Sequence, residues 1–348
     1  MAIAVRNQSV QPMQSSATSP YGLPLVSVIV PTRNRAATLR HLMLALGDQT
    51  YPKDRIELVV VDNDSADDTQ AVFEDLRSGL PFKATFIRQK DRGPAGARNT
   101  GAAAARGEIL AFTDSDCIPC EGWITEGVAA MSAGAGVVAG SIQPIGPVGL
   151  LWKQVPDRGH DDGIYPTANL FTRKADFHRL GGFDERYGVY PWGGLMGGED
   201  TELAWRLRRA GASAAFAGAA LVEHQSTRTT PRAWLLSPLA MQVLPKLVRD
   251  IPELRRTYLW RGYFASRSHF LFDVLILGGL AAALSSWWEI AVLAALPWLF
   301  AMHPALFAYL RRGRPDRAFV VLGLLGYAYA GSLLVLLVAS FRYWRLVL

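Results

Sequence analysis

The chain has 348 residues, which is long enough for a large catalytic domain with further segments. Hydrophobic residues make up 50% of it, and they are concentrated after Phe270, which predicts membrane segments. The basic residues behind the net charge of +6 cluster beside that apolar region, so an anionic membrane surface accounts for them better than nucleic acid does. Zinc-finger spacing and basic-aromatic stripes are absent from the sequence, and nucleic acid is not an expected partner.

The first 22 residues are rich in Ser, Gln and Pro and lack the sustained apolar core of a signal peptide. We predict a disordered segment over residues 1–22. The domain that follows, residues 23–228, is therefore expected to begin in the cytoplasm.

Strands and helices are expected to alternate through the first half of this domain. The expected strands are Val26–Val30, Ile56–Val61, Ala84–Arg88 and Ile109–Asp114, and the expected helices are Ala36–Gln49, Gln70–Arg77 and a small-residue helix that opens at Gly93. Such alternation predicts a mainly parallel sheet, whose ligand crevice lies beyond the carboxyl ends of its strands. Polar motifs follow three of these strand ends, so we expect them to converge on one crevice.

Asp114 and Asp116 lie at the end of the fourth expected strand. Taken alone, an Asp-x-Asp pair is also explained by a solvated loop or a helix N-cap. Two carboxylates at this place suit a hard divalent cation that also binds nucleotide phosphates. The convergence of polar motifs on one crevice favours the metal site over the loop.

Arg98 lies on the expected helix that opens at Gly93, where it suits either a diphosphate contact or a structural ion pair. This segment does not match the dinucleotide-binding or P-loop patterns, and its small residues also suit close helix-on-sheet packing. Cys117 and Cys120 form a single Cys-x-x-Cys without a second pair. Free thiols in a reducing compartment explain them better than a zinc or redox site.

A series of short motifs resembles the family 2 glycosyltransferases in order and spacing, over about Leu25 to His224. The motifs are Val26–Arg35, Val59–Ser65, Gly96–Gly101, Asp114–Asp116, Leu180–Glu185 and Gly198–Leu203. The resemblance implies the GT-A fold and a nucleotide-sugar donor. It also implies that Pro31, Arg33 and Asp62 line the nucleoside pocket and that the Asp114 and Asp116 motif binds metal and diphosphate.

The resemblance further implies that Asp200 is the catalytic base, with Glu199 as the fallback. From the residues alone, both acids open a helix after two glycines, where a simple capping role is the alternative. His224 is interpreted either as a further metal ligand or as a structural hydrogen-bonding residue. Trp192 suits stacking on a sugar ring or packing of its own loop.

The last part of the chain is expected to contact the membrane. Residues 229–268 place basic and aromatic residues at amphipathic spacing, which suits a membrane interface or a helix packed on the catalytic domain. Within residues 269–348, the stretches Phe270–Ser286, Ile290–Tyr309 and Ala318–Phe341 approach the ~20 residues that span a bilayer. We predict three transmembrane helices in the cell (inner) membrane, with the catalytic domain in the cytoplasm.

The sequence thus predicts an α/β protein, with a Rossmann-like GT-A domain followed by transmembrane helices. Its expected activity is inverting transfer of a single sugar, dependent on Mg²⁺ or Mn²⁺, from a nucleotide-sugar to a lipid-linked or polysaccharide-precursor acceptor at the membrane. Single transfers are expected because the Gln-x-x-Arg-Trp motif of processive family members is missing. The alternative is a non-catalytic membrane scaffold or lipid-translocating subunit with a nucleotide-binding domain.

Overall fold

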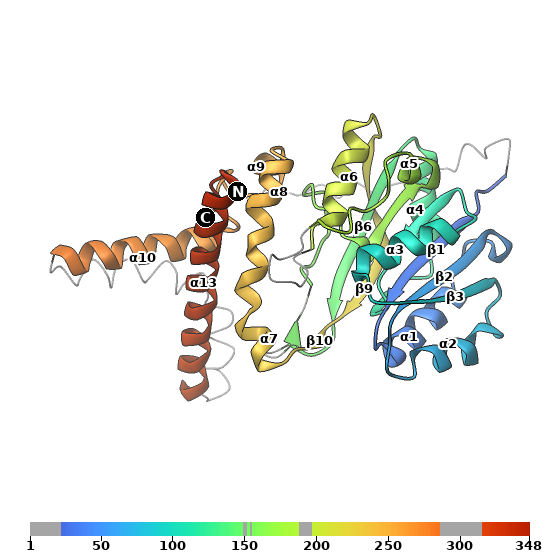
Figure 1. Cartoon of the computed structure of the whole chain (residues 1–348), viewed down its shortest axis with the longest axis horizontal. Helices are drawn as coiled ribbons and strands as arrows, with labels where there is room; N and C mark the ends of the chain where they lie inside the picture. Colours follow the sequence, from blue (N-terminus) through green and yellow to red (C-terminus); the bar gives the residue numbers. More distant parts are fainter. Residues whose placement is uncertain (1–21, 149–151, 154, 188–196, 286–314) are drawn as a thin grey trace, which may run out of the picture.

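A computed structural model describes residues 22–148, 152–153, 155–187, 197–285 and 315–348 (Figure 1). Apart from its last residue, the predicted disordered segment lies outside these ranges. Trp192 and the second expected membrane segment, Ile290–Tyr309, also lie outside the described residues.

The described residues form an eight-stranded sheet of order β3-β2-β1-β4-β8-β6-β9-β5 and a small ladder of β7 with β10. The strands are β1 Val26–Thr32, β2 Ile56–Asn63, β3 Lys83–Gln89, β4 Ile109–Phe112, β5 Cys117–Pro119, β6 Val137–Ile145, β7 Trp152–Lys153, β8 Leu170–Arg173, β9 Ala214–Gln225 and β10 Thr227–Arg228. The predicted parallel part is confirmed for β1 to β4. The other half is mixed, because β8 runs antiparallel to β4 and β6, and β5 runs antiparallel to β9.

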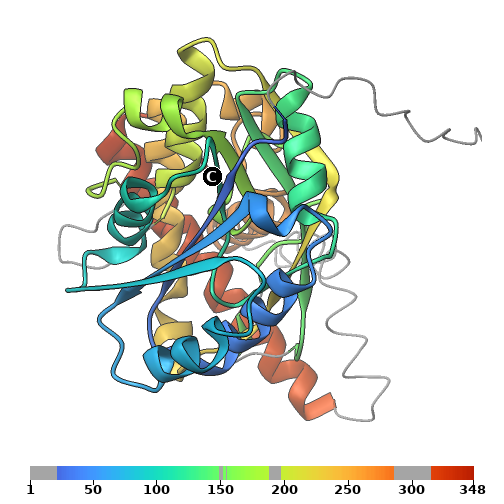
Figure 2. The ribbon, with the colours of Figure 1, turned by 90° about the vertical axis from the view of Figure 1, so that its right-hand side faces the viewer.

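Two buried apolar layers cover the sheet. The helices of the catalytic part are α1 Ala36–Gly47, α2 Thr69–Arg77, α3 Gly93–Ala104, α4 Trp123–Ser132, α5 Lys174–Arg179 and α6 Glu199–Arg209. Successive residues of a strand point to opposite faces, so Val28 and Val30 join the layer that contains residues of α1, α2 and α4. Ile29 joins the other layer, with residues of α3 and α6. In Figure 2 these strands and helices lie in front of the C-terminal helices.

Helix α3 lies very close to the sheet. A Cβ atom added at Gly101 would come within 2.6 Å of the Cγ2 of Ile29 on β1, a contact that only glycine avoids. The small residues of this segment therefore permit the close packing that the sequence suggested. This packing brings Arg98, one helical turn earlier, beside the end of β4.

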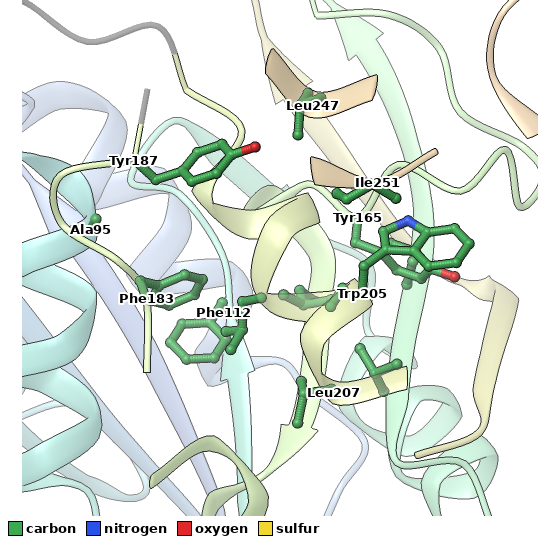
Figure 3. Close-up of a cluster of buried hydrophobic side chains, with 14 of the residues drawn as sticks. Ala95, Phe112, Tyr165, Phe183, Tyr187, Trp205, Leu207, Leu247 and Ile251 are labelled. Carbon is green, nitrogen blue, oxygen red and sulfur yellow. The ribbon is translucent and has the colours of Figure 1, made fainter. Parts of the chain in front are cut away.

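Residues 229–268 were expected either to lie at a membrane interface or to pack on the predicted catalytic domain, residues 23–228. In the structure they pack on that domain. They form α7 Pro231–Leu235, the 3₁₀ helices at Ser237–Gln242 (η3), α8 Val243–Asp250 and α9 Leu254–Thr257. Leu247 and Ile251 share a buried cluster with Trp205 and Leu207 of α6 (Figure 3). The apolar face of this segment is thereby used to hold α6, which carries the two predicted base residues.

The expected membrane location is contradicted. Within the described ranges, no helix is both long enough and apolar enough to cross a bilayer. Helix α13 (Pro315–Tyr343) packs along η3 and α8, while α10 (Arg267–Ser285) projects away from it (Figure 1). Leu336 and Ala339 of α13 are buried, so part of the apolar content that suggested spanning helices belongs to the protein core.

Candidate active site

A cavity of about 490 Å³ opens where β1, β2 and β4 end. Its walls come from Pro31, Thr32, Arg33, Arg35, Asn63, Pro94, Arg98, Asp114, Ser115, Asp116, Val155, His224 and Thr227. Most of the predicted binding and metal residues thus share one space, as expected for the carboxyl edge of a parallel sheet. Among the described residues the exceptions are Asp62 and the two predicted base residues, Glu199 and Asp200.

A tight turn after β4 presents Asp114 and Asp116. The backbone N–H of Cys117 donates to the Asp114 carbonyl at 3.0 Å, which closes the turn. The Thr113 hydroxyl donates to the carbonyl of Ala168 at 2.9 Å and fixes its start. The N–H of Gln225 donates to the Asp116 carbonyl at 2.9 Å, so the turn is also tied to the end of β9.

Asp116 is held between two basic side chains. His224 Nε2 lies 3.6 Å from its Oδ1, and Arg35 Nη2 lies 3.5 Å from its Oδ2. Burial raises the pKa of Asp116 and the Asp114 charge adds to this, while His224 and Arg35 oppose the shift. A bound divalent cation would favour the ionised form, which is the form that coordinates metal.

The donor atoms at this wall fit a divalent metal ion. A ligand atom of each of Asp116, Cys117 and His224 lies within 4.8 Å of the other two. Carboxylate and imidazole ligands accept Mn²⁺ and related ions. Asp114, the other predicted ligand, lines the same cavity but contacts Arg98, so its place in the metal site stays a prediction. Cys117 was not expected here.

Arg98 connects the Asp114 turn to α6. Its Nη2 lies 2.7 Å from Asp114 Oδ1 and its Nη1 lies 3.1 Å from Glu199 Oε1. The side chain is almost fully buried. Burial lowers the pKa of Arg98, but the Asp114 and Glu199 charges outweigh this and the pKa is raised overall. Of the two roles suggested for Arg98, a structural ion pair and a diphosphate contact, the structure shows the ion pair. Arg98 also lines the cavity.

Asp200 is fixed by backbone donors. The N–H of Thr201 donates to its Oδ1 at 2.7 Å, and the N–H of Thr167 donates to its Oδ2 at 3.2 Å. Each carboxylate oxygen retains a lone pair for a further hydrogen bond. Burial raises the pKa of Asp200, and the two N–H groups and Arg98 oppose this. The fixed orientation of the carboxylate and its raised pKa both suit a group that accepts a proton.

Glu199 shares this environment. Burial and the Asp200 charge raise its pKa to about 7, while Arg98 opposes the shift. Two acids with raised pKa values at one helix start titrate as a pair rather than independently. The chain places them there through Gly197 and Gly198, whose φ angles of +79° and +96° turn it sharply into α6.

Asp62 lies below the cavity rather than in its wall. Its side chain has no exposed surface, and its Oδ1 accepts the N–H of Ser65 at 3.2 Å. Arg88 Nε lies 3.6 Å from its Oδ2. The neighbouring Asn63 lines the cavity instead. The role of Asp62 in binding a nucleoside stays a prediction. The stacking of Trp192 on a sugar ring also stays a prediction, because Trp192 lies outside the described residues.

Sequence reasoning missed Arg35, Asn63 and Cys117. The first two belong to motifs that were recognised, but nothing in a motif shows which of its side chains turn towards the crevice. Cys117 directly follows the Asp-x-Asp pair and was assigned only as a free thiol. Its contact with His224 depends on the pairing of β5 with β9, between residues far apart in the sequence.

Comparisons with known proteins relate this chain to glycosyltransferases. Residues 27–186 match the family model described as "Glycosyl transferase family 2". "Glycosyltransferase AglE" of Haloferax volcanii is 32% identical over 56% of this chain and 65% of its own length. "Pre-mycofactocin glycosyltransferase" of Mycobacterium tuberculosis is 30% identical over 60% of this chain and 44% of its own length. The chain thus spans less than two thirds of the length of either relative.

Among solved structures, the mannosyltransferase PcManGT from Pyrobaculum calidifontis, in complex with GDP-Man and Mn²⁺, has a TM-score of 0.60. It is 20% identical, with 91% of this chain and 89% of that chain covered, and it supports the GT-A-like fold. The names of the relatives favour the predicted glycosyltransferase over a non-catalytic scaffold. Residues 27–186 therefore resemble a glycosyl transferase family 2 domain in sequence.

Proposed function

We propose that this protein transfers one sugar from a nucleotide-sugar donor to an acceptor hydroxyl, with inversion at the anomeric carbon. The observation that carries the proposal is the cavity at the ends of β1, β2 and β4, with Asp116 and His224 in its wall. Arg98 ties this wall to the helix that begins with Glu199 and Asp200. Donor and acceptor would meet between these two elements.

The donor would bind with its diphosphate near Asp114, Asp116 and His224. Arg33 and Arg35 lie in the same cavity and offer guanidinium groups to phosphate oxygens. A bound Mg²⁺ or Mn²⁺ would neutralise the charge that develops on the leaving nucleoside diphosphate. The residues named here would hold that ion and orient the donor.

Asp200 would remove the proton from the attacking hydroxyl. The N–H groups of Thr167 and Thr201 fix its orientation, and a positioned base of this kind typically contributes ~10²–10⁴-fold to the rate. A single base with one metal ion suffices for a direct in-line displacement, which inverts the configuration. Glu199 would then act through the electrostatics of the pair, and it is the second candidate for the base.

For the acceptor we propose a lipid-linked or polysaccharide-precursor glycan. A second cavity of about 420 Å³ lies beside α6, on the side of Glu202 and Arg206 rather than at Asp200, and would bind a part of the glycan remote from the attacking hydroxyl. Arg209, Lys246 and Asp250 in its wall are charged groups that suit sugar hydroxyls. Parallel assays with a polyprenyl-linked sugar and with a free oligosaccharide would separate the two acceptor forms.

The test of the transferase is turnover of a nucleotide-sugar panel with Mg²⁺ or Mn²⁺, in Asp200→Asn and Asp116→Ala beside the unaltered protein. We expect each substitution to lower the rate by at least about 10²-fold while the protein stays folded. Glu74→Gln, on the exposed surface of α2, serves as the matched control and keeps its rate. Near-normal turnover in both site variants would refute the proposal.

A further inference from the structure

The cavity wall contains a thiol that the proposed reaction does not use. Cys117 Sγ lies within 4.8 Å of a carboxylate oxygen of Asp116 and of a ring nitrogen of His224. Asp116 and His224 line the cavity, whereas Cys117 lies directly behind them and has no exposed surface. An ion that reached the two cavity residues would therefore meet the sulfur at its inner side.

The sheet fixes this arrangement. Cys117 on β5 and His224 on β9 are directly opposite in an antiparallel pair, and opposite residues project to the same side of a sheet. Asp116 precedes Cys117, and its carbonyl accepts the N–H of Gln225 at 2.9 Å, next to His224. Cys117 and His224 are thus held by strand pairing, and the turn that carries Asp116 is tied to the same pair of strands by this hydrogen bond.

His224 has the orientation of a metal ligand. Its Nδ1 lies 3.1 Å from the carbonyl oxygen of Gln225, so that Nδ1 is placed to donate. The other nitrogen, Nε2, faces Asp116 at 3.6 Å and would then carry the free lone pair. A ring nitrogen fixed in this way by a backbone carbonyl is the common arrangement around metal-binding histidines.

The donor set differs from the one that Mg²⁺ prefers. Mg²⁺ takes oxygen ligands, whereas one thiolate, one imidazole and one carboxylate are the ligand types of Zn²⁺. Sites with nitrogen and sulfur donors also bind Zn²⁺ more tightly than Mn²⁺ in general. The composition of this wall is therefore suited to a thiophilic ion.

We propose that Asp116, Cys117 and His224 form a binding site for Zn²⁺, and that Zn²⁺ excludes there the Mg²⁺ or Mn²⁺ that supports transfer. Binding replaces the S–H bond of Cys117 by a sulfur–zinc bond and releases the proton to solvent. Three protein ligands would leave a fourth coordination position for water or phosphate. The exclusion rests on the proposed function, whereas zinc binding does not.

The competing explanation is that Cys117 is only a small core residue. It belongs to the buried cluster that contains Trp123 and Ile124 of α4, where a thiol packs as an apolar group. The two explanations differ in what happens to a metal ion when the sulfur is replaced. A packing residue would leave the spectrum and the affinity of the ion unchanged.

The experiment uses Co²⁺ as a spectroscopic substitute for Zn²⁺ on the full chain. We expect a near-ultraviolet thiolate-to-cobalt charge-transfer band in the unaltered protein and its loss in C117S. Cys120→Ser is the matched control, because Cys120 lies three residues further along and outside the cluster. Its band should persist. The affinity for Zn²⁺, measured by competition with a chelating indicator, should fall at least about ten-fold in C117S.

C117A repeats the test with an apolar replacement, should C117S not fold. A band that remains in either folded variant, or no band in the unaltered protein at saturating Co²⁺, would overturn the proposal. Transfer assays test whether Zn²⁺ excludes the ion that supports transfer. For each protein, the rate is expressed relative to its own rate without Zn²⁺. The Zn²⁺ concentration that halves this relative rate should be at least about ten-fold higher in C117S than in the unaltered protein. If turnover is absent throughout, the cobalt spectrum still decides on the zinc site alone.

Discussion

Arg98 is a buried cation whose two partners belong to different parts of the site. It pairs with Asp114 after β4 and with Glu199 at the start of α6, and its side chain is almost fully removed from solvent. Removal of one partner from a buried ionic group leaves the remaining charges unpaired, which costs more than the pair itself contributes. The protein therefore depends on this arginine for stability as well as for the geometry of the site.

We expect Arg98→Met to lower the free energy of unfolding by about 3–5 kcal/mol. The buried Glu199 and the partly buried Asp114 would then lose their shared cation. Arg179→Met is the matched control, because Arg179 forms an exposed pair with Asp176 and its loss should cost about 1 kcal/mol or less. Denaturant unfolding measures both. Equal losses of stability in the two variants would show that the ion pairs of Arg98 with Asp114 and Glu199 stabilise the protein no more than an exposed pair does.

Glu199 predicts a dependence of stability on pH. Its pKa is raised from 4.5 in the unfolded reference to about 7 in the folded protein. Between these values the unfolded chain has lost the proton that the folded protein keeps, so the free energy of unfolding falls as pH rises. Glu199→Gln should flatten this fall and leave the parts contributed by the other acids with raised pKa values, among them Asp116 and Asp200. Unfolding curves from pH 4 to pH 8 that have equal slopes in both proteins would contradict the raised pKa.

At the scale of elements, the start of α6 decides where the predicted base lies. Gly198 has φ of +96°, and a Cβ there would come within 2.9 Å of the Cγ2 of Val243 on α8. Gly197 has φ of +79° and nothing within 4 Å of an added Cβ. Both positions require a left-handed backbone conformation, but only at Gly198 would a side chain also collide with a neighbouring helix.

We expect Gly197→Ala and Gly198→Ala each to destabilise the protein by about 1–2 kcal/mol through backbone strain. Gly198→Ala should cost more than Gly197→Ala, because Val243 must also move, and it should lower the transfer rate further since Glu199 follows directly. Denaturant unfolding and steady-state rates of both variants make the comparison. If Gly197→Ala is the more damaging of the two, the contact with α8 does not position the helix.

The elements that sequence analysis predicted well are those with local signals. The strands β1 to β4 and the helices between them follow from apolar runs bounded by turn residues, and Asp114 and Asp116 fall where they were placed. The order β4-β8-β6-β9-β5 depends on pairing between distant segments, for which a single sequence carries no signal. For the same reason the burial of Asp62 and the contact of Cys117 with His224 escaped prediction.

At the scale of the whole molecule, residues of α8, α9 and α13 belong to a buried core shared with the sheet and α6. Leu247 and Ile251 share one buried cluster with Trp205 and Leu207 of α6. The sequence showed their amphipathic spacing but left open which surface they cover. Apolar composition alone does not separate a face buried in lipid from one buried in protein, and this explains the error in the predicted membrane location.

Leu247→Ala should lower the free energy of unfolding by about 2–5 kcal/mol, because the cavity it leaves lies inside that cluster. Leu236→Ala is the control, since Leu236 is 48% exposed and its loss should cost about 0.5 kcal/mol or less. Denaturant midpoints compare the two. Equal midpoints would mean that α8 is only loosely attached to α6.

The position of β9 has a consequence for how the molecule acquires its binding properties. β5 is an edge strand that pairs with β9 alone, although β9 begins almost a hundred residues later. The acid at position 116 consequently gains its hydrogen bond to the N–H of residue 225 only when β9 has been placed beside it. During refolding, recovery of cation binding should therefore follow the slowest sheet-forming phase, because closing such a long loop delays the contact.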